Sequence, residues 1–240
     1  MFSKTYEMRY GDYKDFEQIK VSSLLDLVQD ISIAHSDACG NGLNAMRDQH
    51  RAWLLQGVKL HLERPAKVGL PITLKTAVAT ARGITSERGC LIEQEGEVIG
   101  KTVASWFYFD TEAMKPARIP AEFAEAYGLH DFGDDFFRYR KPEQTEAEAL
   151  YTVRVSNKEL DTNNHLNNQK SAELLMDALP FDFVLTDMTV YYKKAAYLGD
   201  ILTLCRKELK NGWYACLQSE GEVCVAATFT KGERSWRPNT

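Results

Sequence analysis

The chain has 240 residues, of which 44% are hydrophobic and 26% are charged. This composition excludes a disordered chain, a collagen-like repeat and a small disulfide scaffold. The formal net charge of −5 argues against a protein whose main partner is a nucleic acid. We expect no signal peptide and no membrane span, because no sufficiently long apolar stretch occurs. Five scattered cysteines without a C-x-x-C pair predict reduced thiols and a cytoplasmic location.

The first half of the chain predicts a strand, then a helix, then four further strands. The helix is expected over 22–39, with Ser22 or Ser23 as its N-cap and Gly40 as its stop. One face of this helix carries residues at helical spacing: Leu24, Val28, Ile31 and His35. A histidine on such a face is expected to be a core or pocket-lining residue. Alternating and β-branched residues predict strands at about 52–63, 71–82, 84–95 and 98–110.

The second half predicts the same order of elements. Segment 111–149 lacks clean periodicity and is interpreted as a connection. Its aromatic residues are expected to pack on the surface: Phe132, Phe136, Phe137 and Tyr139. A shorter helix is expected over 167–179, capped by Asn167 or Asn168 and ended by Pro180. Strands are predicted at about 186–194, 199–208, 212–220 and 222–230.

Two sequence matches indicate that the chain contains a duplicated unit. Glu-Gly-Glu-Val occurs at 95–98 and again at 220–223, each time between two β-rich stretches, where it predicts a hairpin turn. Upstream, 57–74 aligns without gaps against 187–204. Each unit therefore predicts an antiparallel sheet with one helix across its face, which is an α+β arrangement.

The densest polar cluster runs from Asp161 to Asn168, immediately before the second helix. One interpretation is a capped, solvated loop, because Asp and Asn favour turns. The functional interpretation is that Asp161, Asn163 and His165 alternate along an extended stretch and point to one side. Backbone N–H groups at the helix start, near Asn167 and Asn168, would then stabilise an oxyanion. No metal-ligand spacing or dinucleotide motif accompanies this cluster.

The pattern Asp161-x-Asn163-x-His165-x-Asn167-Asn168 resembles the D-x-N-x-H-x-N-N motif of the acyl-acyl carrier protein thioesterases. The stretches FSKTYEMRYGDYKDF, LLQGVKLHLE and SWFYFD are similar to the N-terminal half of that family. The resemblance implies two tandem hotdog units, each a curled antiparallel sheet around a central helix. We place these units at 1–125 and 148–240, joined by a linker at 126–147.

The resemblance also implies an activity: hydrolysis of the thioester between a fatty acyl chain and acyl carrier protein (ACP), without a metal or cofactor. Asp161 or His165 would deprotonate water, and Asn163 would hold the water or the carbonyl. The acyl chain would lie in the first unit. Leu24, Val28 and Ile31 would either line its pocket or be ordinary core residues. The enzyme would act as a monomer or a homodimer.

One departure from the family concerns the position where members carry an acidic residue, and plant members also a cysteine. Here Ala195 and Ala196 occupy that place, and Cys205 lies nine residues beyond Ala196, so we expect no cysteine nucleophile. Lys193 and Lys194 are candidates for docking the acidic carrier, although a solvated strand end is the alternative. Three other functions remain open: a hotdog acyl-coenzyme A thioesterase, an enoyl-thioester hydratase or dehydratase, and an inactive acyl-binding module.

Overall fold

The computed structural model describes residues 1–14, 19–161, 163–181 and 183–232. The chain divides into two compact units, Met1–Tyr139 and Arg140–Thr240. Each has its own antiparallel sheet and its own helix against that sheet, and this helix has 18 residues in the first unit and nine in the second. In the described part of the chain, no helix is long and apolar enough to cross a membrane.

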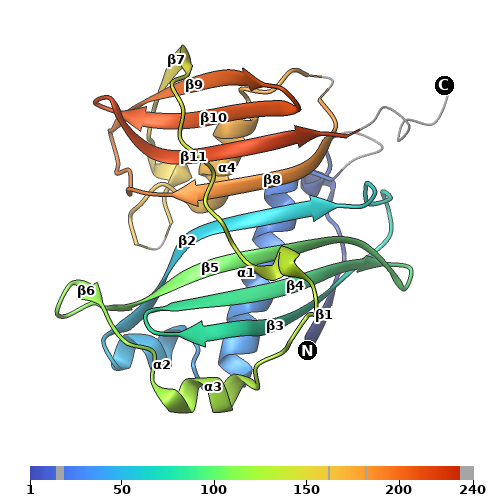
Figure 1. Cartoon of the computed structure of the whole chain (residues 1–240), viewed down its shortest axis with the longest axis vertical. Helices are drawn as coiled ribbons and strands as arrows, with labels where there is room; N and C mark the ends of the chain where they lie inside the picture. The colour runs from blue at the N-terminus through green and yellow to red at the C-terminus, as the bar shows by residue number, and fades with distance from the viewer. Residues whose placement is uncertain (15–18, 162, 182, 233–240) are drawn as a thin grey trace. The chain divides into compact units, whose positions relative to one another are not determined.

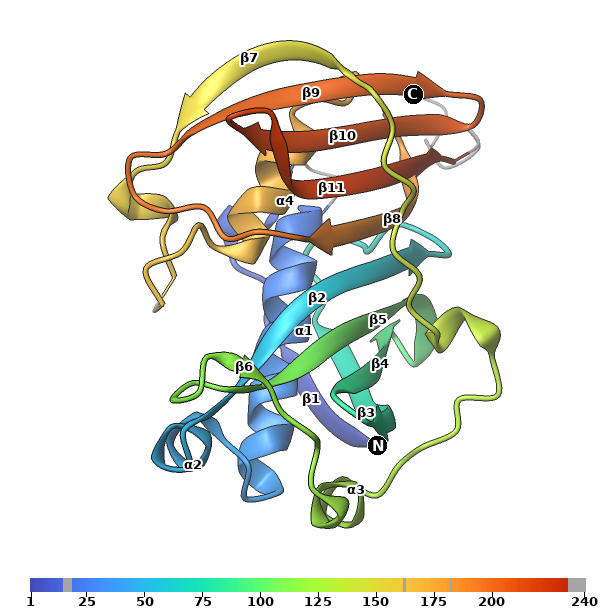
Figure 2. The same ribbon diagram turned by 60° about the vertical axis from the view of Figure 1, so that its left-hand side comes forward.

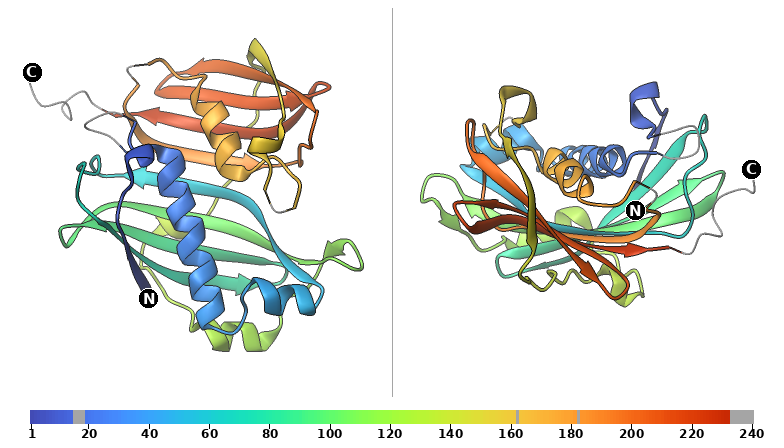
Figure 3. Two further views of the ribbon diagram at one scale, coloured as in Figure 1. Left: turned by 180° about the vertical axis from the view of Figure 1, so that it is seen from behind. Right: turned by 90° about the horizontal axis from the view of Figure 1, so that it is seen from above.

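Unit 1 is a sheet with the strand order β1-β3-β4-β5-β2 (Figure 1). These strands are β1 (Phe2–Tyr6), β2 (Arg51–Leu62), β3 (Ile72–Arg82), β4 (Thr85–Gln94) and β5 (Glu97–Asp110). The two-residue β6 (Lys115–Pro116) pairs with the end of β5. Helix α1 (Val21–Ala38) crosses one face of this sheet (Figure 3). Short helices complete the unit: α2 (Leu43–Asp48), α3 (Ala121–Tyr127) and 3-10 turns at Tyr10–Asp12 and Asp135–Phe137.

Unit 2 is a sheet with the strand order β8-β11-β10-β9-β7 (Figure 2). Its strands are β7 (Glu148–Arg154), β8 (Leu185–Tyr192), β9 (Ile201–Leu209), β10 (Gly212–Ser219) and β11 (Glu222–Lys231). Helix α4 (Asn168–Met176) packs on β10 and β11, and a 3-10 turn at Asn157–Glu159 follows β7. Ala172 and Leu175 of α4 are buried in the core of this unit.

The two units share one topology, which confirms the duplication predicted from the sequence. Read from the first strand of each unit, the order β1-β3-β4-β5-β2 corresponds to β7-β9-β10-β11-β8. The two Glu-Gly-Glu-Val segments form equivalent hairpin turns. Glu95 and Gly96 have φ angles of 56° and 82°, and Glu220 and Gly221 have 51° and 81°. Two consecutive positive φ angles are typical of the type I′ turn, whose twist matches that of the flanking strands.

The ends of the two long helices correct parts of the prediction. In α1 the N-cap is Lys20, whereas Ser22 and Ser23 are buried within the helix and cap nothing. Gly40 is in the left-handed region, with φ 75°, as a helix stop requires. Helix α4 ends at Met176 rather than at 179. The reason is that Ala178 and Leu179 donate to carbonyls three residues back, and this tighter turn closes the helix before Pro180.

The segment before unit 2 is more ordered than predicted. Helix α3 was not expected, although Pro120 stands directly before it and Gly128, with φ 59°, directly after it. The prediction that the aromatic residues lie on the surface is wrong for Phe137, which is buried, whereas Phe132, Phe136 and Tyr139 are half-buried. The reason is that these rings pack against the sheet. The rings of Phe132 and Phe137 stack at 4.0 Å, and they cover β4 at Gly89, where a Cβ atom would lie 2.5 Å from Phe132.

Candidate active site

The polar segment before α4 is a closed turn organised by Asp161. The Oδ1 atom of Asp161 accepts hydrogen bonds from the backbone N–H of Asn163 at 2.8 Å and of His165 at 3.1 Å. The backbone of Asp161 donates to the carbonyl of His165 at 2.8 Å, and Asn164 donates to the carbonyl of Asp161 at 3.1 Å. Asn164 takes a positive φ of 61°, which Asn tolerates better than most residues.

This geometry shows that the expected extended stretch is wrong. Asp161, Asn163 and His165 do not alternate along a strand, because the chain reverses direction between Asp161 and His165. The physical reason is that a short carboxylate satisfies nearby backbone N–H groups and so favours a turn over extended backbone. Asn163 is exposed at this turn, whereas Asp161 and His165 are half-buried.

His165 is held by its neighbours on both sides of the turn. It forms an antiparallel bridge with Tyr197, and its ring meets the Tyr197 ring edge-on with centroids 5.0 Å apart. Leu166 donates its backbone N–H to the carbonyl of Ala196 at 2.8 Å. Within the described residues, no hydrogen bond joins the Asp161 carboxylate to the His165 imidazole. The two side chains are therefore linked through the backbone of the turn.

The start of α4 is capped by the motif itself. The Oδ1 atom of Asn167 accepts the backbone N–H of Gln169 at 2.8 Å, as predicted for Asn167 or Asn168. The Tyr192 hydroxyl donates to the carbonyl of Asn168 at 3.1 Å and ties this helical turn to β8. The N–H of Asn168, the first helical residue, belongs to the donors that have no acceptor inside a helix.

The loop after β8 contains the two alanines that depart from the family pattern. Ala195 is exposed and Ala196 is buried, so neither brings an acid or a nucleophile to the turn. Cys205 of β9 is also buried, and burial raises the pKa of its thiol to about 11. A thiol with that pKa is almost entirely protonated at neutral pH and is a poor nucleophile.

The two lysines proposed for docking differ from one another. Both side chains are exposed. Lys194 forms an ion pair with Glu222, with Nζ and Oε2 2.8 Å apart, which raises the pKa of Lys194. Among the described residues, no carboxylate pairs with Lys193. Lys193 is therefore the better of the two for contact with an acidic partner.

The three expected pocket residues of α1 are all buried within unit 1: Leu24 is 3% exposed, Val28 is 6% and Ile31 is 0%. His35 continues the same helical face and is 7% exposed, as expected for a core or pocket-lining histidine. Its partner was missed from the sequence. Arg88 of β4 is 7% exposed, and its Nη1 atom lies 2.7 Å from His35 Nδ1. A single arginine among the alternating residues of β4 gave no signal of this contact.

The comparisons with known proteins match both units. The N-terminal domain model of acyl-ACP thioesterases matches residues 1–127, and the C-terminal domain model matches residues 140–236. The chain belongs to the acyl-ACP thioesterase family. It is a thioester hydrolase, and fatty acyl-ACP is its substrate. No curated protein sequence matches the chain.

Two solved structures of similar proteins share the fold across both units of this thioesterase. An acyl-ACP thioesterase from Bacteroides thetaiotaomicron has a TM-score of 0.86 at 16% identity, covering 96% of this chain and 97% of that one. A 12:0-ACP thioesterase from Umbellularia californica has a TM-score of 0.82 at 16% identity, covering 95% of this chain and 96% of that one. The α+β fold of two tandem hotdog units is thereby confirmed.

Proposed function

We propose that this thioesterase hydrolyses fatty acyl-ACP by direct attack of water, with His165 as the general base. The observation that carries the proposal is the turn of Asp161, which fixes His165 beside Tyr197, two residues before the N-cap of α4. Imidazole is the side chain best suited to take and return a proton near neutral pH. Asp161 holds the turn through Oδ1, and its negative charge favours the imidazolium that forms during the reaction.

The reaction proceeds through one tetrahedral intermediate. The water oxygen bonds to the thioester carbon while His165 takes the water proton. Asn163, exposed on the turn, holds the water or the carbonyl oxygen. The developing oxyanion is stabilised by the N–H of Asn168 at the positive end of the α4 dipole. The intermediate collapses by breaking the C–S bond, and His165 returns its proton to the leaving thiolate of the phosphopantetheine arm.

A cysteine nucleophile is not part of this proposal. Cys205 is buried and its pKa is raised to about 11, so its thiolate is scarce. General-base help of the kind proposed for His165 is typically worth about 10²–10⁴-fold in rate, and a thioester is already an activated ester.

The acidic carrier is proposed to dock through Lys193, with Lys194 contributing less because of its pairing with Glu222. The acyl chain is proposed to lie in unit 1 beside Leu24, Val28 and Ile31. The oligomeric state, monomer or homodimer, is a prediction that light scattering would test. The expected cytoplasmic location is a prediction that cell fractionation would test.

The experiment that tests the proposal is product analysis with a ladder of acyl-ACP thioesters, repeated with the matching coenzyme A thioesters. Release of free fatty acid, faster from ACP than from coenzyme A, is expected. Faster release from coenzyme A would contradict ACP as the preferred carrier. Conversion of an enoyl or 3-hydroxyacyl thioester without C–S cleavage would indicate a hydratase or dehydratase, and binding without turnover would indicate an inactive module.

A further inference from the structure

Unit 1 buries a positive charge that has no carboxylate partner in the part of the unit that the structure describes. Arg88 is 7% exposed, and its side chain lies on the α1 side of the sheet. Its Nη1 atom donates to His35 Nδ1 at 2.7 Å, and its Nη2 atom donates to Ser36 Oγ at 3.4 Å. Within the described chain, neither an aspartate nor a glutamate forms an ion pair with Arg88. A buried charge without an opposite charge is costly, so such groups are usually paired.

His35 cannot supply the missing negative charge. A guanidinium has no acceptor, so the 2.7 Å contact requires His35 Nδ1 to accept and the ring to carry its proton on Nε2. Burial and the nearby Arg88 charge lower the pKa of His35 to about 4, which keeps the ring neutral at neutral pH. His35 is thus a neutral acceptor for one of the five guanidinium N–H groups and a donor through its other nitrogen.

Tyr127 of α3 adds a third donor beside the first two. Its ring meets the His35 ring edge-on with centroids 5.3 Å apart, and its ring centroid lies 5.4 Å from the guanidinium carbon of Arg88. The Tyr127 hydroxyl is buried beside Arg88 and Ser36, and within the described residues no acceptor with good hydrogen-bond geometry takes its proton. An unsatisfied buried hydroxyl costs about 1–3 kcal/mol. The three side chains therefore form a donor-rich cluster that lacks a strong acceptor.

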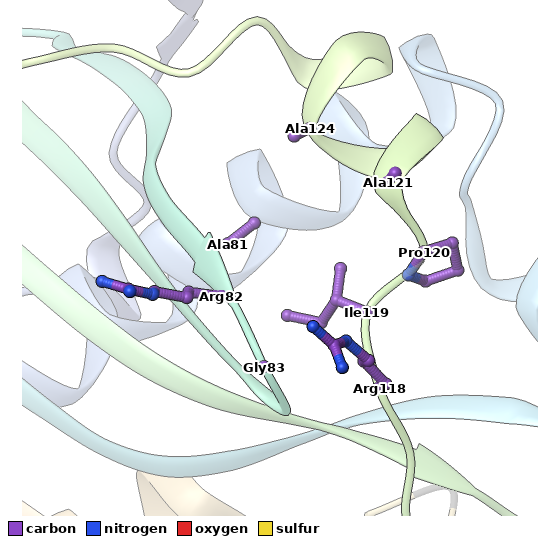
Figure 4. Close-up of a pocket in the computed structure, with 8 residues that line it drawn as sticks. All are labelled: Ala81, Arg82, Gly83, Arg118, Ile119, Pro120, Ala121 and Ala124. Carbon is purple, nitrogen blue, oxygen red and sulfur yellow. The ribbon is translucent and has the colours of Figure 1, made fainter.

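On the Tyr127 side, this cluster borders apolar residues. Tyr127 also belongs to a hydrophobic cluster whose other buried members are Met46, Val78, Tyr108, Ile119 and Phe123. A hollow of about 460 Å³ lies beside that cluster (Figure 4). Its lining includes Ile119, which is a member of the cluster, and Ala81, which packs against it. The arginines Arg82 and Arg118 also line it, whereas Arg88, His35 and Tyr127 do not. A ligand with an anionic oxygen group and a hydrocarbon chain would match both the donors and the apolar residues.

We propose that Arg88, Tyr127 and His35 form a binding site for the carboxylate of a fatty acid inside unit 1. Arginine and a phenol O–H together satisfy both carboxylate oxygens, and charge-assisted hydrogen bonds are the strongest available to a buried guanidinium. Such a carboxylate has two sources: the free fatty acid released by the proposed reaction, or the distal end of a dicarboxylic acyl chain. The physiological role rests on the proposed function, whereas the binding itself does not.

Binding is measured on the full-length protein by isothermal titration calorimetry, with dodecanoate and dodecanol as probes below their micellar concentrations. The wild type is expected to bind dodecanoate at least about tenfold more tightly than dodecanol. Arg88→Met should weaken dodecanoate binding at least about tenfold and leave dodecanol unchanged. The matched control is Arg138→Met, because the Arg138 side chain is 74% exposed and contacts Asp135, and this variant should bind as the wild type does.

If Arg88→Met does not fold, Tyr127→Phe still tests the proposal, because it removes one hydroxyl group and keeps the packing of the ring. It should weaken dodecanoate binding by about threefold to tenfold. In a separate arm, hydrolysis of dodecanoyl-ACP is compared with that of the mono-thioester of dodecanedioate. If Arg88→Met loses hydrolysis of the dicarboxylic substrate selectively, the ligand is the distal carboxylate of the acyl chain. If added dodecanoate inhibits only the wild type, the ligand is the released fatty acid.

Equal binding of dodecanoate and dodecanol by the wild type would overturn the proposal. Unchanged dodecanoate binding in folded Arg88→Met and Tyr127→Phe would do so as well. Dodecanoate binding that depends on Arg88, in a protein that hydrolyses no thioester, would refute the proposed function and leave the carboxylate site intact.

Discussion

The Asp161 carboxylate has a structural task and a proposed catalytic task, and two substitutions separate them. Its Oδ1 atom accepts two backbone N–H groups, at 2.8 and 3.1 Å. Asp161→Ala removes both hydrogen bonds, and by analogy with helix caps we expect a loss of about 2 kcal/mol in the free energy of unfolding. For a chain of this size that corresponds to a Tm lower by about 4–8 °C. Asp161→Asn keeps an acceptor oxygen at the same place, so its loss should stay below about 1 kcal/mol.

The effect of Asp161→Asn on kcat should be much larger than its effect on the free energy of unfolding. Asp161→Asn removes the negative charge, and we expect kcat with acyl-ACP to fall by about 10²-fold, which is about 2.7 kcal/mol in the barrier. The assay is single-turnover release of fatty acid, together with thermal unfolding of the same preparation. Wild-type kcat in folded Asp161→Asn would refute the catalytic role and leave Asp161 as a residue of the turn alone. Asn164→Gly, which tolerates the positive φ of this position and loses no side-chain hydrogen bond of the turn within the described residues, serves as the control for both measurements.

Four further predictions concern other residues. His165→Ala should lower kcat by at least about 10²-fold, with a small loss in Tm from the lost ring contact with Tyr197, and near-normal kcat would exclude His165 as the base. Cys205→Ala should retain activity, and a folded but inactive variant would restore a thiol mechanism. Lys193→Ala should raise KM for acyl-ACP, more so at low salt, with kcat unchanged. Lys194→Ala should raise it less, and an equal increase with an acyl-coenzyme A would argue against carrier docking. His35 binds a proton more tightly in the unfolded chain, with a pKa near 6.5, than in unit 1, with a pKa of about 4. Stability should therefore fall as the pH falls from about 6.5 to about 4, and His35→Gln should remove that part of the dependence in denaturant unfolding.

Most of the fold was predictable because its strongest signals are local. The four strands after each helix were placed to within about two residues, since alternation and the turns at Gly96 and Gly221 mark their ends directly. Helix α3 was missed because seven residues rich in Ala and Glu carry little periodicity, although Pro120 and Gly128 flank it.

The residues of the candidate site were predictable from the sequence, but the backbone conformation of its turn was not. The polar cluster was placed correctly at the entry to a helix, with Asn167 as its N-cap and Asn168 as the first helical residue. The turn was missed because an Asp followed by Asn residues is compatible with both extended and reversed backbone, and the hydrogen bonds of Oδ1 decide between them. Arg88 was missed for another reason: its contact with His35 joins residues 53 apart in the sequence.

The paired hairpins have a consequence for engineering a more heat-resistant biocatalyst. Glu95 and Glu220 both occupy positions with positive φ, which side chains other than Asn, Asp and Gly adopt at a cost. Glu95→Asn and Glu220→Asn would turn each segment into Asn-Gly, the dipeptide that type I′ turns prefer. Glu220→Asn is expected to stabilise unit 2, whereas Glu95→Asn also removes the ion pair of Glu95 with Lys67, which offsets part of the gain in unit 1. Neither replacement alters the turn of Asp161 or the charge buried at Arg88. The duplication thus provides two corresponding turns at which thermal stability can be raised. Both turns are separate in sequence from the residues proposed for catalysis and for carboxylate binding.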